Sequence, residues 1–521
     1  MNVERLSRLV IASLVLCFLQ ANSAVSASDL YLPKMPETYA RDKASPEYKA
    51  FNKGWLKLYN QEADGARELF KSAARDFPNS ERIAFGQSLV EYYLGEPTVA
   101  MPMVEKALSK HPASKELKML KAMILCNDEH PELAAKLYDQ LLSQDKNNPE
   151  LLRLRCAALI GQFKLAQAKS DIERCLKLAP QWKNPLHLKG QIAFYEGQIK
   201  AAIDNYSKAI VDKNDPNLAE ILESRAEAYT RLYEFAKARA DISAADDKTY
   251  FGLDSYNENI ANAEYEYIHR ESNIARRFLI AVGFPLAFQN DLGLLTVAGK
   301  APQDKDKKDA LEKLKDVWGF TDRKQTLEMI WYLTSGAGND EWMELWKEKR
   351  TLVGTLEQKR RQLLSKHHHT SYGKIDLVMK YGDEFGERGV TGYDLGRSTN
   401  LCRDAVRAGI LTEKEGLMIM LHNASALQST YKSWEQYHRE YLVGRSFWNP
   451  DIQAQDQAGM QLAANSYLKD PQSPICQIPW NTPISYETVF PGEKSSAQKA
   501  QTPNSKNSTE AKTSPECHCS D

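Results

Sequence analysis

The 521-residue sequence has little cysteine and almost no net charge. Eight cysteines are too few for a disulfide scaffold in a chain of this length. Lysine plus arginine number 68 and aspartate plus glutamate 69, so the net charge of −1 gives no support for electrostatic binding to nucleic acid or anionic lipid. Apolar residues make up 42% and charged residues 26%, which excludes wholesale disorder and polytopic membrane proteins.

Signatures of common catalytic and cofactor sites are also missing. The sequence contains no Walker A loop, GxGxxG, HExxH or GxSxG motif. Three histidines at 367–369 follow a charged helical stretch, and we expect an exposed loop there. Cys517, His518 and Cys519 are better metal or disulfide candidates, but three ligands near the chain end make a weak site at best. We therefore predict no cofactor and no metal.

The first 27 residues are typical of a secretory signal peptide. Arg5 and Arg8 precede an apolar run at 9–19, and the tripeptide at 25–27 fits the small-x-small pattern of signal peptidase sites. The run is too short to span a bilayer. We expect cleavage after Ala27, export to the periplasm or the medium, and no stable membrane span in the mature chain.

A period of 34 residues runs from 47 to 252. Alanine recurs at this period at Ala66, Ala100, Ala134, Ala168 and Ala202, followed by Ala238. A small residue stands twelve positions before each alanine, at Gly54, Ser88, Ala122, Cys156, Gly190 and Ala226. A bulky apolar residue stands four positions after each, at Phe70, Val104, Tyr138, Ile172, Tyr206 and Ile242. Closely packed helices need small side chains where backbones approach and large ones beside them, so the pattern predicts six helix pairs.

These columns, with Pro78, Pro112 and Pro180 closing three of the units, resemble the tetratricopeptide repeat. The resemblance implies six copies stacked into a right-handed solenoid, with the first helix of each pair lining a groove. Segment 28–46 is then an N-terminal linker, and 253–302 holds capping and connecting helices.

Stepping by 34 residues from Trp55 gives the column that we expect to face the groove. With their neighbours, the early repeats then present anchors for a peptide or protein partner: Phe51, Trp55, Tyr59, Phe85, Leu89, Tyr92 and Met123. The stepped column holds no asparagine, which argues against a clamp for C-terminal carboxylates. Alternatively, these aromatics pack against segment 28–46 or against the second domain.

Further motifs lie at Trp318–Arg323, Tyr393–Arg397, Asn400–Arg403, Gly409–Glu415 and Tyr441–Trp448. Their order and spacing resemble the bacterial family known as domain of unknown function 1266, which usually has tryptophan in place of Tyr393. The resemblance implies a compact helical domain over 303–450 and brings no established activity.

Candidate functional residues of this domain are Asp394, Arg397, Arg403 and Arg445. Asp394 and Arg397 stand one helical turn apart and can form an ion pair. We favour a structural network in which Asp394 and Arg445 tie helices together. In the alternative, Asp394 is a general base or metal ligand, and Arg397 or Arg445 holds an anion.

Several local features complete the prediction. We expect one long charged helix over 340–364, and capping boxes at Thr412–Glu415 and Ser433–Gln436. We expect an irregular segment over 451–490 and a disordered tail over 491–521. Cys156 and Cys175 fall on facing helices and either form a disulfide or serve as small buried thiols.

The sequence thus predicts an exported all-α protein, in which a solenoid of six tetratricopeptide helix pairs precedes a compact helical domain. The leading hypothesis for its function is a scaffold whose groove captures a peptide or protein, with no nucleic-acid partner. The alternative is an enzyme or toxin-like effector that acts through the C-terminal domain.

Overall fold

The structure is a computed structural model that describes residues 35–493, except 37, 61, 95, 128–129, 212–217, 246–251, 288–292, 299–303 and 451–453. Every regular element in these residues is a helix. The predicted signal peptide and the Cys517–Cys519 cluster lie outside the described residues, as does the tail beyond 493.

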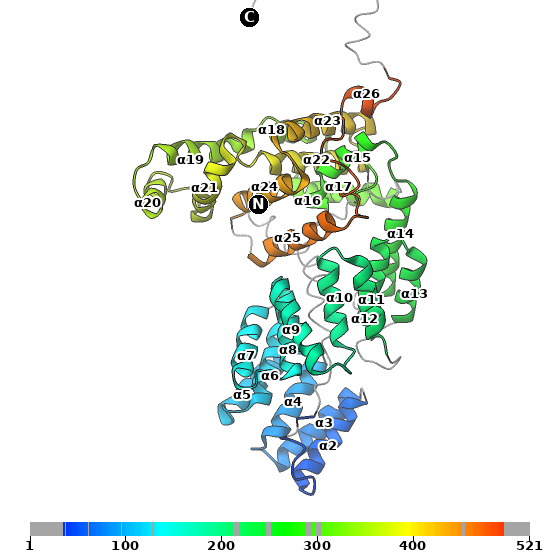
Figure 1. The fold of residues 1–521 in the computed structure, drawn as a ribbon, viewed down its shortest axis with the longest axis vertical. Helices are drawn as coiled ribbons and strands as arrows, with labels where there is room; N and C mark the ends of the chain where they lie inside the picture. The colour runs from blue at the N-terminus through cyan, green and yellow to red at the C-terminus, as the bar shows by residue number, and fades with distance from the viewer. Residues whose placement is uncertain are drawn as a thin grey trace, which may run out of the picture.

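Six helix pairs form the first part of the chain, as the 34-residue period predicts. They stack one on the next in chain order (Figure 1). The pairs are α2 (Pro46–Tyr59) with α3 (Ala63–Asp76), α4 (Glu81–Tyr93) with α5 (Pro97–Lys110), α6 (Lys115–Asn127) with α7 (Pro131–Gln144), α8 (Pro149–Gly161) with α9 (Leu165–Leu178), α10 (Pro185–Tyr195) with α11 (Ile199–Ala209), and α12 (Leu218–Arg231) with α13 (Phe235–Ala245).

The repeated small and large positions hold the pairs together. A β-carbon at Gly54 would lie 2.7 Å from the ring of Phe70, so glycine is needed where the two helices of the first pair meet. Gly190 lies in the same way against the buried ring of Tyr206. Cys156 and Cys175 occupy small-residue columns on the two helices of the fourth pair, where both are buried and not joined in a disulfide.

Replacing Gly190 by alanine is expected to destabilise the chain by about 1–3 kcal/mol, because the added methyl group overlaps the Tyr206 ring in a packed core. Gly65→Ala is the matched control, since a β-carbon there meets the Lys57 and Glu62 side chains at ordinary contact distances of 3.6 and 4.0 Å. That change should be neutral or stabilise α3 by up to about 1 kcal/mol. Urea unfolding followed by circular dichroism measures both variants, and equal stability of the two would contradict the packing argument.

Helix α14 (Leu253–Ile268) covers the end of the repeat stack. Its Ile260 is buried in one cluster with Ala226, Phe235 and Ile242 of the last pair. The segment after it, α15 (Ile274–Val282), belongs to the core of the second part, because its apolar side chains pack with α22 and α23 residues. None of the helices in the described residues is long and apolar enough to cross a membrane.

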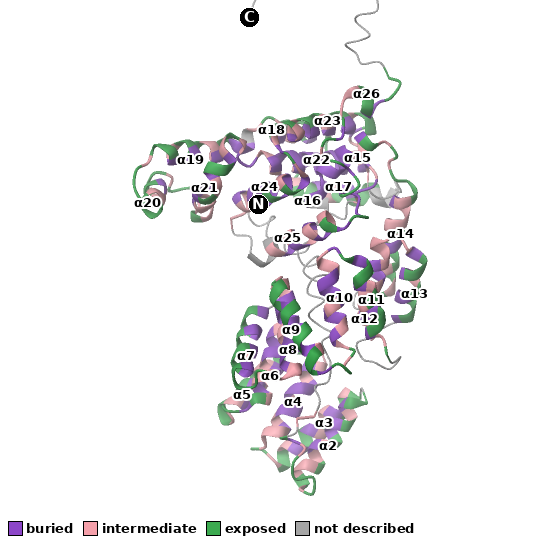
Figure 2. Cartoon of the chain, in the orientation of Figure 1, coloured by how far each residue is buried: buried purple, intermediate pink, exposed green. Residues whose placement is uncertain are grey.

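The second part is built around one central helix. Helix α22 (Thr391–Arg407) is largely buried (Figure 2) and packs against the short helix η3 (Ala337–Asn339) and against six α-helices. These are α15, α16 (Phe284–Ala287), α17 (Asp304–Trp318), α18 (Arg323–Thr334), α23 (Glu413–Thr430) and α24 (Trp434–Trp448). A smaller core around Trp342 lies in the arm that projects to one side in Figure 1, made of η3 (Ala337–Asn339), α19 (Asp340–Thr351), α20 (Leu356–Lys366), α21 (Tyr372–Phe385) and η4 (Gly386–Arg388).

Two sequence predictions about this part are wrong. The expected single helix over 340–364 is two helices, because Gly354 adopts a φ of +122° and Thr355 begins α20 with its own capping box. The expected irregular segment over 451–490 contains α25 (Ala454–Lys469) and α26 (Tyr486–Val489). Buried isoleucines at 475 and 478 anchor that segment to the core, so it is an integral part of the domain.

Helix α25 also joins the second part to the repeats, lying between α24 and α10 (Figure 1). Its Ser466 hydroxyl donates a hydrogen bond to the Phe194 carbonyl at 2.8 Å. The Arg231 guanidinium, at the end of α12, stacks on the Tyr467 ring and lies 3.6 Å from the Asp470 carboxylate. The repeats and the second part are therefore in direct contact through buried polar and aromatic groups.

Candidate functional site

The candidate site is the face formed by the first helices of the repeat pairs, which we call the first-helix face. Of the predicted groove residues only Tyr59 is exposed, at 70%. The others are at most 5% exposed, which corrects the expectation that they present a free surface: Phe51, Trp55, Phe85, Leu89, Tyr92 and Met123. Successive first helices contact one another, so residues one repeat apart pack together along the stack.

Part of this face is covered by the segment that precedes α2. The Tyr39 ring meets the Phe51 and Phe85 rings edge-on, with centroids 5.7 and 5.3 Å away. Its hydroxyl donates a hydrogen bond to Glu81 Oε1 at 2.8 Å, and the Ser114 hydroxyl donates to the same oxygen at 2.7 Å. We call Phe51, Glu81, Phe85 and Ser114 the tyrosine seat. For Phe51 and Phe85 the structure supports the alternative in which the aromatics pack against segment 28–46.

The backbone around Tyr39 is held as well. The Arg82 guanidinium donates hydrogen bonds to the carbonyls of Tyr39 and Arg41, at 3.2 and 3.5 Å. The Thr38 hydroxyl donates to Glu116 at the start of α6. The Pro36 carbonyl accepts hydrogen bonds from the backbone N–H groups of Tyr39 and Ala40, which closes a turn. The first-helix face of three consecutive repeats therefore binds both the side chains and the backbone of a short non-helical segment.

Electrostatics keep the Tyr39 phenol in its protonated form. Burial raises the pKa of Tyr39 far above its usual range, and the neighbouring Glu81 carboxylate raises the pKa further. A protonated phenol donates a hydrogen bond, and a carboxylate can only accept one. The seat thus matches a neutral tyrosine side chain.

The last two repeats present a polar first-helix face. The buried His187 of α10 faces Ser224 of α12, with Nε2 and the hydroxyl 3.1 Å apart, and Nδ1 lies 3.9 Å from Glu220. Burial lowers the pKa of His187 to about 3. Tyr256 of α14 donates a hydrogen bond to Glu223 at 2.9 Å. The face therefore changes from aromatic at its N-terminal end to carboxylate and imidazole at its C-terminal end.

In the second part the structure brings Asp394 and Arg397 together as an ion pair. Asp394 is 1% exposed, and the Arg397 guanidinium lies over the rings of Tyr393 and Trp448, 4.3 and 4.9 Å from their centroids. Burial raises the pKa of Asp394, and Arg397 opposes that change. A carboxylate enclosed in this way ties α22 to α24 through the aromatic stack, and it offers no open surface to a substrate.

Arg403 and Arg445 are both buried. The buried Arg403 donates hydrogen bonds to the carbonyls of Thr296 and Val297, at 3.1 and 3.0 Å, and to the Gly293 carbonyl. It fixes the chain segment that follows α16 to the central helix. Arg445 is buried beside Tyr441, whose pKa it lowers against the larger raising effect of burial. Asp394 is thus paired with Arg397, and the predicted tie between Asp394 and Arg445 stays a prediction.

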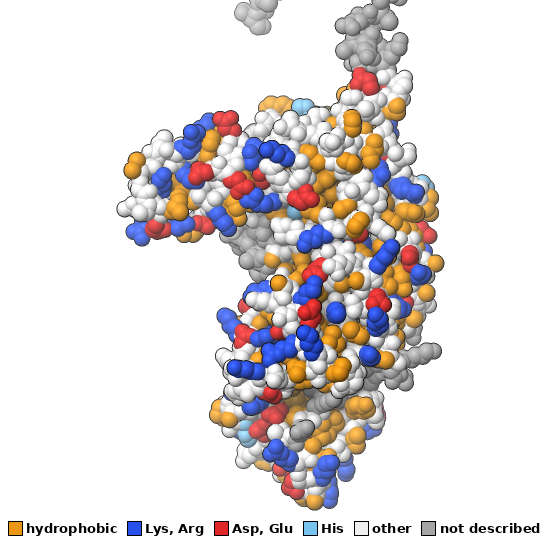
Figure 3. All heavy atoms as spheres, in the orientation of Figure 1, with side chains coloured by type: hydrophobic (Ala, Val, Ile, Leu, Met, Phe, Trp, Pro, Cys, Tyr) orange, Lys and Arg blue, Asp and Glu red, His pale blue; other side chains and the backbone are white. Residues whose placement is uncertain are grey.

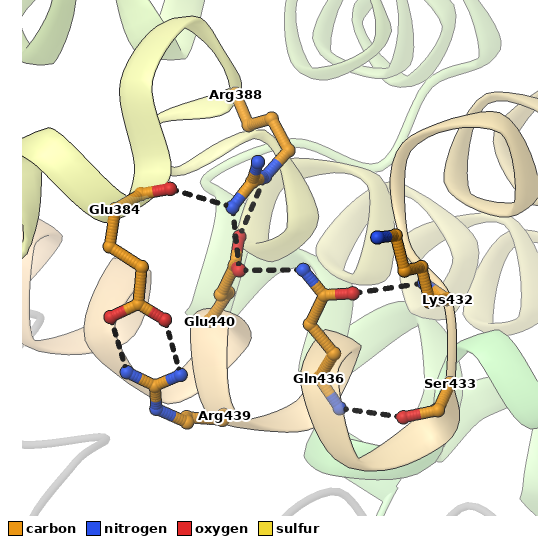
Figure 4. Close-up of polar contacts among 7 residues, drawn as sticks. All are labelled: Glu384, Arg388, Lys432, Ser433, Gln436, Arg439 and Glu440. Atoms are coloured by element: carbon orange, nitrogen blue, oxygen red, sulfur yellow. Dashed lines mark hydrogen bonds and ion pairs between the residues drawn. The ribbon is translucent and has the colours of Figure 1, made fainter.

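Sequence analysis missed a second buried carboxylate, shown in Figure 4. Glu440 is almost fully buried and accepts hydrogen bonds from Arg388 Nε and Nη2, at 3.2 and 3.0 Å, and from Gln436 at 3.1 Å. Arg388 stands 52 residues earlier, at the end of the arm. Gln436 and Glu440 are four residues apart and share a face of α24, so their contact could have been predicted from the sequence. The contact with Arg388 could not, because Arg388 is distant in the sequence.

The capping predictions differ in outcome at the two positions. Thr412 and Glu415 form the expected reciprocal capping box. Ser433 accepts a hydrogen bond from the Gln436 backbone N–H at 3.2 Å, but the Gln436 side chain bonds Lys432 and Glu440 instead of closing a box (Figure 4). The side-chain N–H group of Gln436 therefore donates its hydrogen bond to the buried Glu440.

The described residues contain no group of three or more His, Cys, Asp or Glu side chains that could hold a metal ion. Of the three consecutive histidines, His367 is engaged by Glu348, with Nε2 and the carboxylate oxygen 2.6 Å apart. Glu348 also pairs with Lys366, and these hydrogen bonds lower the pKa of Glu348. This cluster joins the end of α20 to α19.

Residues 313–480 match the family described as "Protein of unknown function (DUF1266)". No curated protein matches the chain. Among solved structures, a tetratricopeptide repeat protein from Parabacteroides merdae is 19% identical, covering 42% of this chain and 88% of that one, with a TM-score of 0.32. MamA from Desulfovibrio magneticus is 17% identical, covering 32% of this chain and 94% of that one, with a TM-score of 0.27. The six helix pairs of the 34-residue period are therefore followed by a domain similar to the DUF1266 family.

Proposed function

We propose that the chain is an exported scaffold whose first-helix face captures a short segment of a peptide or protein. The observation that carries the proposal is the seating of residues 38–41 on that face. Arg82 binds backbone carbonyls there, and the tyrosine seat binds one side chain. In recurring modes of peptide recognition, backbone hydrogen bonds supply affinity and side-chain pockets supply specificity. Export is proposed from the signal-like residues 1–27 and is tested by N-terminal sequencing of the mature protein, with Ser28 expected first.

Site-specific photo-crosslinking in the full chain tests the capture of a partner. Tyr59 is exposed on α2, and Tyr372 is exposed on α21 of the second part, so a photoreactive phenylalanine replaces each in turn. The full chain is required, because α15 and α25 tie the repeats and the second part together. A specific adduct from envelope or medium at position 59, absent at 372, is the expected result. An adduct only at 372 would place the function in the second part, and adducts at neither would count against the scaffold.

A further inference from the structure

We infer that the tyrosine seat determines which segment the first-helix face accepts: a turn that presents a neutral tyrosine. Residues 38–41 of the chain occupy the seat and compete with that ligand. The inference rests on the proposed scaffold function and names the chemistry of its ligand. It is carried by the contacts of the Tyr39 ring with Phe51 and Phe85 and of its hydroxyl with Glu81.

The seat discriminates by side chain. Two phenylalanine rings meet the Tyr39 ring edge-on, an arrangement that suits any aromatic side chain. The Glu81 carboxylate distinguishes tyrosine from phenylalanine, because only the phenol can donate the 2.8 Å hydrogen bond. Ser114 donates to the same carboxylate oxygen and holds it in place. A phosphorylated tyrosine would place its negative charge against Glu81 and is excluded.

The backbone contacts set the shape of the ligand. Arg82 donates hydrogen bonds to the backbone carbonyls of Tyr39 and Arg41, and these bonds do not depend on which side chains the ligand carries there. The Pro36 carbonyl accepts the N–H groups of Tyr39 and Ala40, so the tyrosine stands at the end of a turn. A ligand in a regular helix would have its carbonyls engaged internally and could not satisfy Arg82 in the same way. We therefore expect the partner segment to form a turn with the tyrosine at the end of it.

Residues 38–41 belong to the same chain as the tyrosine seat, so they compete with any partner segment for it. Only residues 42–45 separate Arg41 from the start of α2 at Pro46. A tether this short keeps Tyr39 at a high effective concentration beside the seat, roughly millimolar or above for short flexible linkers. A partner must exceed that local concentration or bind additional parts of the face. Opening the seat should therefore reveal binding that the intact chain suppresses.

Fluorescence anisotropy with a labelled synthetic peptide of residues 35–45 tests the inference on the full-length chain. The Tyr39→Ala chain should bind this peptide at least about tenfold more tightly than the unmodified chain, because the cis competitor has lost its anchor. A peptide with phenylalanine at position 39 should bind about tenfold more weakly, since a hydrogen bond to a charged acceptor is lost. A peptide with alanine there should not bind. Tyr372→Ala, at an exposed tyrosine of α21 in the second part, is the matched control and should behave as the unmodified chain.

Two further variants separate seat opening from misfolding. Tyr39→Phe keeps the ring in place and should give intermediate peptide binding. Tyr39→Ala combined with Glu81→Met, which removes the acceptor oxygen, should lose the preference for the tyrosine peptide over the phenylalanine peptide. Equal binding of tyrosine and alanine peptides, or equal binding by the unmodified and Tyr39→Ala chains, would overturn the inference. A crosslinked partner at position 59 would still support the scaffold in that case, so the two proposals fail separately.

Discussion

The Asp394→Ala variant is expected to lose about 3–5 kcal/mol of stability in the second part of the chain, because it leaves the Arg397 cation without a counter-charge in a mostly buried site. Arg397 is enclosed between Tyr393 and Trp448, so water cannot replace the missing carboxylate without opening the packing between α22 and α24. Urea unfolding followed by tryptophan fluorescence measures the loss, since Trp448 lies against the altered site. Asp394→Asn keeps the shape and one acceptor oxygen and should lose less.

Glu384→Ala is the matched control for that measurement. Glu384 pairs with Arg439 in two hydrogen bonds of 2.5 and 2.6 Å, but both side chains are about half exposed (Figure 4). An exposed pair of this kind contributes between about 0 and 1 kcal/mol. If Asp394→Ala were no more destabilising than Glu384→Ala, the structural interpretation of Asp394 would be wrong. An Asp394→Asn protein that keeps full stability but loses a measurable activity would instead favour the enzyme hypothesis.

The repeat architecture was predictable because its physical cause is local and periodic. Gly190 and Tyr206 are sixteen residues apart, and the same spacing separates small and large residues in every pair, so helix positions and their contacting faces follow from the sequence. The break at Gly354 was missed because charged residues on both sides continue a helical pattern, and only the backbone conformation of one glycine ends it. Periodicity therefore located the helices, whereas single-residue conformations set some of their ends.

Exposure on the first-helix face was less predictable. Stepping by 34 residues identified Trp55, Leu89 and Met123 as equivalent, which they are, but it could not tell whether equivalent side chains face a ligand or one another. That choice depends on the distance between successive first helices, a property of the whole stack. Tyr39 had no repeat partner and lay in a segment interpreted as a linker, so its role depended on contacts more than 40 residues away.

The second part shows the same limit. Asp394 and Arg397 could be paired from sequence because they are one helical turn apart. Arg403 binds carbonyls more than 100 residues away, and Glu440 binds Arg388 across 52 residues. Buried charges of this type need partners, but the identity of a distant partner follows only from the packing of the helices.

Acidification is expected to destabilise the chain through two buried histidines. Burial lowers the pKa of His187 and of His438 to about 3, against an ordinary value near 6.5 in the unfolded chain. Below pH 6.5 each histidine is protonated in the unfolded state but stays neutral in the folded state. Each therefore reduces the unfolding free energy by about 1.4 kcal/mol for every unit that the pH falls. Their stabilising contribution is complete above pH 6.5 and declines as the pH falls toward 3. Between pH 6.5 and 5 the two together should remove about 3 kcal/mol.

His438 allows the cleaner test, because neither of its ring nitrogens has a hydrogen-bond partner among the described residues and its ring packs beside Phe284. His438→Phe should therefore fold and unfold with a shallower pH dependence, by about 1.4 kcal/mol per unit below pH 6.5. His130→Gln, at an exposed position, should leave the slope unchanged. His187 faces Glu220 at 3.9 Å, so its replacement removes a polar neighbour as well as a titrating group. An unaltered slope in His438→Phe would mean that the imidazole gains a proton in the folded state, and that α24 opens to admit water near pH 6.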